Sequence, residues 1–66
     1  MNTRKLRGRI REHYGTQEAF AKALDISPAT LSKKLVGKTE WGRQEIEEVC
    51  ALLNIPAEEI HAYFFT

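Results

Sequence analysis

The chain has 66 residues, of which 42% are hydrophobic and 29% are charged. This length predicts a single domain with a marginal core, because chains of this size bury only about 60% of their unfolded surface. One cysteine excludes an intramolecular disulfide and fits a reducing cytosol. No apolar run approaches the ~18 residues that cross a membrane, and no hydrophobic segment follows the basic N-terminus as in a secretory signal. We therefore expect a cytoplasmic protein with no membrane association.

The net charge of +1 conceals a division of charge along the chain. Residues 1–38 contain nine Lys and Arg against three acidic residues, a net of +6, whereas residues 39–66 contain one arginine against six glutamates, a net of −5. A nucleic-acid footprint predicts such a division, because phosphate attraction must be local to the docking face. The alternative is chance, since charges on small helical domains are often uneven.

The first predicted element is a helix from about Thr3 to Tyr14. Leu6 and Ile10 fall on its inner face, together with either His13 or Tyr14. Five cations surround this stripe, and we expect one or two of them to reach a phosphate while the others serve solubility: Arg4, Lys5, Arg7, Arg9 and Arg11.

A second short helix is predicted to begin after Thr16, a good N-cap, with Glu18 in the first turn where a carboxylate suits the positive end of the helix dipole. Gly15 can take a positive φ and end the preceding helix. The spacing of three residues predicts one apolar face: Phe20, Ala21 and Leu24.

A third helix follows a turn at Asp25 and Ile26, with Ser27 as its cap and Pro28 at its first position, where the missing N–H costs nothing. Inward positions fall at Leu31 and Leu35. At about 100° per residue, the opposite face carries small groups and one long cation, with Thr30 on the flank. This outward face comprises Pro28, Ala29, Ser32 and Lys33.

The segment from 16 to 38 resembles the helix-turn-helix of the phage repressor and Cro family, the lambda-repressor-like DNA-binding domains. It has the Thr16-Gln17 opening, a small Ala21 that lets two helices approach, the Gly37-Lys38 exit, and matching apolar residues at Phe20, Leu24, Ile26 and Leu31. It departs from the family where Asp25 replaces the usual turn glycine, and in lacking the Gln or Asn pair that often reads adenine. The resemblance implies an all-α, five-helix domain over residues 1–66, with its helix-turn-helix at about 16–36, binding operator DNA as a dimer.

Lys33 is the candidate base-reading residue, since a lysine there can donate to guanine O6 and N7 or to a phosphate. Ala29 and the ring of Pro28 can touch thymine methyl groups. The alternative for Lys33 is a solvated surface lysine. Residues at helix N-termini suit phosphate oxygens or act only as caps, and Lys34 and Lys38 are either phosphate clamps or surface charges. The predicted DNA-binding set is Thr16, Gln17, Ser27, Pro28, Ala29, Thr30, Ser32, Lys33, Lys34 and Lys38.

Residues 39–42 are predicted to form a loop in which Trp41 packs over the next helix; the alternative is an indole contact with the DNA backbone. A fourth helix over about Arg43–Leu53 has apolar residues at i, i+3, i+4 and i+7, among which Cys50 is expected to be a buried thiol. Pro56 is predicted to open a last helix. The C-terminal apolar residues form either a homodimer interface or part of the core: Ile60, Tyr63, Phe64 and Phe65.

No enzymatic, metal or cofactor site is expected, because His13 and His61 lie far apart and nothing pairs a nucleophile with a base. The sequence favours a sequence-specific, double-stranded DNA-binding transcriptional regulator of the repressor or Cro type. The alternative is a helix-turn-helix-fold protein-interaction module, or an antitoxin-like adaptor, that docks a partner through its acidic half.

Overall fold

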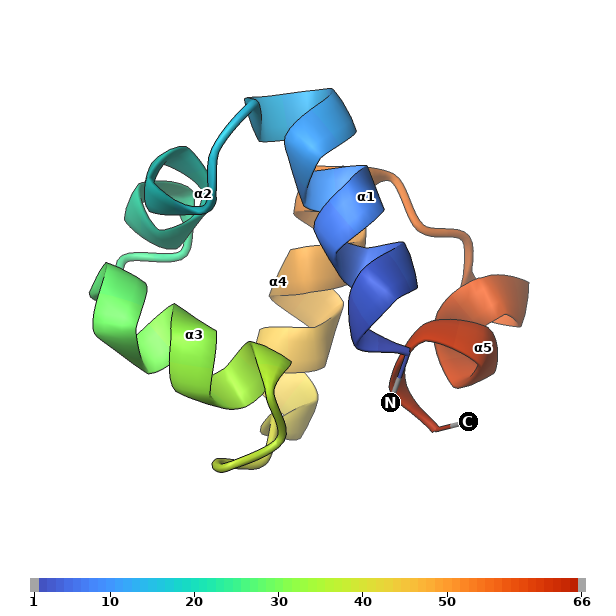
Figure 1. Cartoon of the computed structure of the whole chain (residues 1–66). Helices are drawn as coiled ribbons and strands as arrows, with labels where there is room; N and C mark the ends of the chain where they lie inside the picture. Colours follow the sequence, from blue (N-terminus) through green and yellow to red (C-terminus); the bar gives the residue numbers. More distant parts are fainter. Residues whose placement is uncertain (1, 66) are drawn as a thin grey trace.

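The structure is a computed structural model that describes residues 2–65, and every regular element in this range is helical (Figure 1). The all-α, five-helix fold predicted from the sequence is confirmed over these residues. In chain order the elements are α1 (Thr3–Tyr14), α2 (Gln17–Ala23), α3 (Pro28–Leu35), α4 (Arg43–Leu53), the 3-10 turn η1 (Ala57–Glu59) and α5 (Ile60–Phe64). Helices α2 and α3 lie on one side of α1, and α5 lies on the other.

The helix starts and stops follow the local signals in the sequence. The side-chain oxygen of Thr16 accepts the N–H of Ala19 at 3.1 Å, and that of Ser27 accepts the N–H of Thr30 at 3.1 Å. Both residues are therefore N-caps, as predicted. Asp25 has a φ of 60°, a left-handed conformation in which Asp is one of the tolerated residues. The turn between α2 and α3 forms without the glycine that usually occupies this position.

The C-terminal segment differs from its prediction. Pro56 is extended, and it leads into η1 rather than an α-helix. The N–H of Glu59 bonds the carbonyl of Pro56 at 2.9 Å, the tighter spacing of a 3-10 turn, which is common at helix ends. The last α-helix therefore begins at Ile60 and has only five residues.

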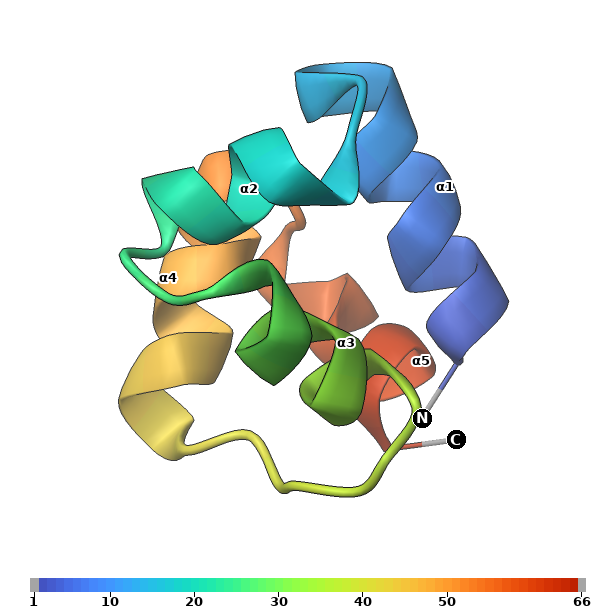
Figure 2. The ribbon, with the colours of Figure 1, turned by 60° about the vertical axis from the view of Figure 1, so that its left-hand side comes forward.

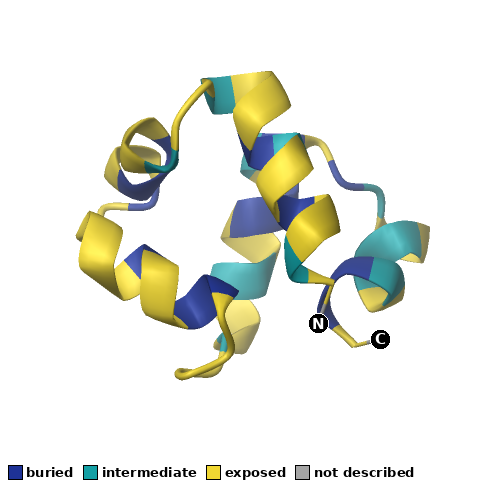
Figure 3. Cartoon of the chain, in the orientation of Figure 1, coloured by how far each residue is buried: buried dark blue, intermediate teal, exposed yellow. Residues whose placement is uncertain are grey.

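One hydrophobic core receives residues from every α-helix (Figure 3). Tyr14 packs against it, with its ring 5.1 Å from that of Phe20, whereas His13 is exposed. This settles which of the two lies on the inner face of α1. The predicted burial of Cys50 is confirmed, and its apolar surroundings raise the pKa of the thiol. The core comprises Leu6, Ile10, Phe20, Ala21, Leu24, Leu31, Leu35, Val49, Cys50, Leu53, Ile55, Tyr63 and Phe64.

The two ends of the described chain are held side by side. The N–H of Asn2 donates to the carbonyl of Tyr63 at 2.9 Å, and the hydroxyl of Thr3 donates to the carbonyl of Leu35 at 2.6 Å. The start of α1 is thereby tied to both the end of α3 and α5. The candidate site described next lies beside these two contacts, between the end of α3 and α5.

Candidate functional site

The outward face of α3 is exposed to solvent, as the sequence predicts. Pro28, Ala29, Ser32 and Lys33 are all exposed, and Thr30 beside them is exposed as well. Figure 2 shows α3 at the front of the molecule, with α2 above it and α1 to one side. Leu31 is fully buried on the opposite side of the helix. The face is accessible, and its DNA contacts remain a prediction.

The predicted phosphate-binding residues have structural roles of their own. Thr16 and Ser27 are occupied as caps, and the hydroxyl of Ser27 also donates to that of Thr30 at 2.9 Å. Gln17 is half-buried at the start of α2, whereas Lys38 is exposed. Because the side chains of Thr16 and Ser27 act as caps, the groups that suit an anion at these helix starts are the backbone N–H groups that the caps do not bind.

Lys34 is not the exposed cation that the sequence suggests. Its side chain is buried, with a residue exposure of 8%. The ammonium lies 2.9 Å from Oε2 of Glu45 and donates to the carbonyl of Glu40 at 3.1 Å. It also lies 5.5 Å from the ring centroid of Trp41. The prediction of a phosphate clamp or a surface charge at Lys34 is therefore wrong, because its donors are used within the protein.

Glu45 joins this network to the start of α4. One carboxylate oxygen accepts the N–H of Gly42 at 2.7 Å and also receives the ammonium of Lys34 at 3.1 Å. The pKa of Glu45 is lowered, first by the bond from Gly42 and then by the bond from Lys34. The sequence signal for the bond between Glu45 and Gly42 is the position of Glu45 three residues after the N-cap, where a carboxylate reaches back to the cap. This signal does not point to Lys34.

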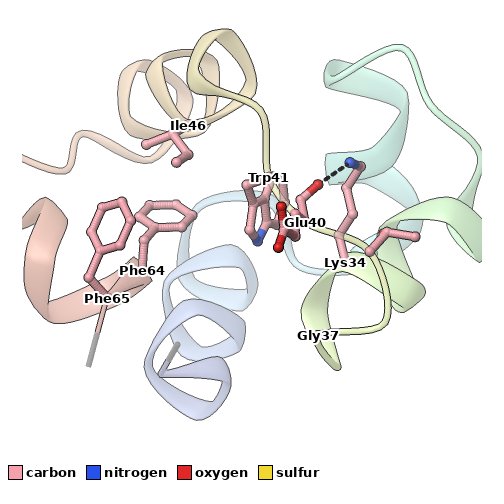
Figure 4. A pocket seen from close by; sticks show the side chains of 8 residues that line it. Lys34, Gly37, Glu40, Trp41, Ile46, Phe64 and Phe65 are labelled. Carbon is pink, nitrogen blue, oxygen red and sulfur yellow. Dashed lines mark hydrogen bonds between the residues drawn. The ribbon is translucent and has the colours of Figure 1, made fainter.

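An aromatic groove lies between the end of α3, the following loop, α4 and α5 (Figure 4). Its volume is about 380 Å³, within the range of small-molecule and side-chain pockets. The ring of Trp41 meets that of Phe64, on α5, edge to face at 5.8 Å, so Trp41 packs against the core; a contact of its indole with DNA stays a prediction. Phe65 is 61% exposed at one end of the groove. The lining residues are Lys34, Gly37, Thr39, Glu40, Trp41, Ile46, Phe64 and Phe65.

The C-terminal apolar residues divide between core and surface. Tyr63 and Phe64 are buried and complete the core, which was the alternative to a dimer interface. Ile60 is half-buried against the core. Of the four residues considered for a homodimer, Phe65 alone is largely exposed in the described chain. Phe65 is therefore the most exposed of the four, and it lies at the aromatic groove.

Among residues 2–65, no group of three or more His, Cys, Asp or Glu side chains is arranged to hold a metal ion. Within the same range, no helix has the length and apolar character needed to span a bilayer. The features that remain as candidates for function are the α3 face and the aromatic groove.

Comparison with known proteins identifies the family of the chain. A family model described as "Protein of unknown function (DUF739)" matches residues 1–66. The chain belongs to the DUF739 family. It is also similar to the modulator of repression (MOR) of the temperate bacteriophage TP901-1 from Lactococcus lactis, whose solution structure is known. The two are 37% identical with a TM-score of 0.87, and the match covers 98% of this chain and 88% of that one. No curated protein gives a significant match.

Proposed function

We propose that this protein modulates transcriptional repression for a phage, acting in the host cytoplasm by contact with a repressor protein. The observation that carries the proposal is the likeness to MOR, which extends over 98% of the chain at 37% identity. MOR is described as a modulator of repression, which is a regulatory rather than an enzymatic role. The proposal corresponds to the protein-interaction alternative of the sequence analysis.

The aromatic groove is the surface that we assign to the repressor. Exposed aromatic side chains are enriched at protein interfaces, and Trp is among the residues that dominate binding energy. Phe65 is exposed and Trp41 is half-exposed, and both line the same groove. Glu40 lies exposed at the rim, within the half of the chain that has a net charge of −5. The partner segment that fits is therefore an apolar anchor with basic side chains beside it.

A second candidate function is direct, sequence-specific binding of operator DNA, as in the repressor and Cro family. The observation that favours it is the exposed face of α3, which carries Lys33 among small side chains. Arg7 and Arg11 on α1 are exposed as well, in the half of the chain with a net charge of +6. The outward face of α3 and the aromatic groove have no residue in common. Substitutions can therefore separate DNA binding from repressor binding.

The test uses this protein, the repressor from the same genome and its operator DNA in a mobility-shift titration. We expect this protein alone to leave the operator unshifted, and to change the operator occupancy of the repressor when the two are mixed. Phe65→Ala should abolish that change, and Lys33→Ala should preserve it. A shift by this protein alone that Lys33→Ala abolishes would establish the DNA-binding function instead. No effect on the repressor at any concentration would overturn the proposal.

A further inference from the structure

Lys34 extends from the buried side of α3 into the loop that follows, where it meets three groups at once. Its ammonium lies 2.9 Å from Glu45 and 5.5 Å from the centroid of the Trp41 ring. It also donates to the carbonyl of Glu40 at 3.1 Å (Figure 4). These partners lie six to eleven residues further along the chain. A single cation thus ties the last turn of α3 to the loop and to the first turn of α4.

The indole of Trp41 is held between this cation and the core. Phe64 supports the indole through an edge-to-face contact at 5.8 Å, and Lys34 supports it through a cation–π contact. Trp41 is only half-buried and its backbone lies in a loop without regular structure, so the position of the ring depends on its contacts with neighbouring groups. The indole is also a wall of the aromatic groove. The position of the ring therefore decides the shape of the groove.

We propose that Lys34 is the positioning residue of the aromatic groove: its ammonium, anchored by Glu45, holds the Trp41 indole as the groove wall. Glu45 suits this role because its carboxylate is itself fixed by the N–H of Gly42 at 2.7 Å. Lys33, the preceding residue, is exposed to solvent and takes no part. Two adjacent lysines of α3 thus serve different surfaces, one the outward face and the other the groove.

The proposal concerns the groove of the proposed function, but its test needs no partner. Trp41 is the sole tryptophan of the chain, so tryptophan fluorescence reports this ring alone. Lys34→Met keeps most of the apolar stem and removes the ammonium, whereas Lys34→Arg keeps a cation with several donors. Lys33→Met is the matched control, because it removes an adjacent exposed lysine. Far-ultraviolet circular dichroism establishes that each variant is folded at the temperature used.

We expect Lys34→Met to shift the Trp41 emission to the red and to increase acrylamide quenching, because losing a cation–π contact of this size raises the ratio of displaced to held rings about two- to fivefold. Lys34→Arg should restore both values toward the wild type, and Lys33→Met should leave them unchanged. A merely stabilising role would lower the melting temperature of Lys34→Met without moving its emission at a temperature where it is fully folded.

Unchanged emission and quenching in folded Lys34→Met would overturn the proposal and would mean that the other contacts of Trp41 suffice to hold the ring. If Lys34→Met does not fold, Glu45→Gln provides the second measurement, since it removes the anchoring charge while keeping an oxygen for the N–H of Gly42. The same red shift is expected there, and its absence overturns the proposal. If Trp41 responds as expected but the repressor binds neither form, the proposed function fails and the positioning role stands.

Discussion

The guanidinium of Arg9, on α1, donates through Nε to the carbonyl of Leu53 at 2.9 Å, and Leu53 is the last residue of α4. A second nitrogen of the same group donates to the carbonyl of Asn54 at 2.6 Å. The last carbonyls of a helix have no partner within it and carry partial negative charge. A cation from the first helix therefore caps the end of the fourth, although the residues are 44 positions apart.

Replacing Arg9 by Met should lower the free energy of unfolding by about 1.5–3 kcal/mol, the usual worth of hydrogen bonds to a charged group. The side-chain volume is largely kept, so the loss reports the hydrogen bonds of the guanidinium: those to the two carbonyls and the longer one to the hydroxyl of Tyr63 at 3.5 Å. Urea unfolding followed by circular dichroism measures it. Arg11→Met is the control, because Arg11 is exposed and should change stability by no more than about 0.5 kcal/mol. Equal effects of the two variants would contradict a cap at Arg9.

The helices could be predicted from local signals, whereas the use of individual cations could not. The bounds of α1 and α4 match their predicted ranges, and the caps Thr16 and Ser27 sit where expected, because caps and periodicity act within one or two turns. Arg9 and Lys34 resemble the other basic residues in sequence. Their partners lie 44 and 11 residues away, and only the folded chain brings those partners within reach.

The burial of the C-terminal aromatic residues also could not be predicted from local signals. The sequence offers Phe64 and Phe65 as equals, since an apolar run in a short helix has no unambiguous face. In the structure α5 ends at Phe64, which is buried, whereas Phe65 follows the helix with a non-helical φ of −125° and is exposed. The aromatic groove could not be predicted, because it depends on where this helix ends and on the placement of Trp41.

Truncating the two phenylalanines should therefore have different consequences. Phe64→Ala should destabilise the protein by about 3–5 kcal/mol, because Phe64 is a buried core residue. Phe65→Ala should change stability by no more than about 0.5 kcal/mol, as expected of an exposed side chain. Thermal unfolding separates the two. A large loss of stability in Phe65→Ala would show that Phe65 belongs to the core rather than to a docking surface.

Glu45 should make stability depend on pH in the acid range. Its pKa in the folded protein lies below the ordinary value of 4.5, chiefly through the bond from Gly42 and then through Lys34. A carboxyl whose pKa is lowered by folding contributes stability that is present above its unfolded pKa. That contribution is lost as the pH falls below about 4.5 and through the folded pKa. Urea unfolding at pH 7 and at pH 3 should show Glu45→Gln less stable than the wild type at pH 7, with the difference shrinking at pH 3. A difference independent of pH would contradict the ionic contact with Lys34.

Cys50 should be protected from thiol reagents while the protein is folded. The residue is 8% exposed, and burial raises the pKa of its thiol, so little of the reactive thiolate forms. Reaction with Ellman's reagent at pH 8 should be slow in buffer and rapid in a denaturing concentration of urea. Fast reaction in buffer would indicate that the end of α4 opens readily, since Cys50 lies in its last turns.

The last prediction tests the α3 face as a DNA-binding surface. Lys33 is exposed opposite the buried Leu31, so a base edge or a phosphate could reach its ammonium. If it reads a base, Lys33→Ala should cost roughly 1–3 kcal/mol at the preferred site and relax the base preference there. If it contacts only a phosphate, affinity should fall uniformly across sequences, and the slope of log affinity against log salt should shrink by about 0.9. Fluorescence anisotropy with labelled duplexes at several salt concentrations distinguishes these outcomes.

The control is Lys34→Met, which should leave the slope unchanged because the ammonium of Lys34 is held inside the protein. Identical DNA binding by the wild type and Lys33→Ala would exclude Lys33 from the DNA-binding residues.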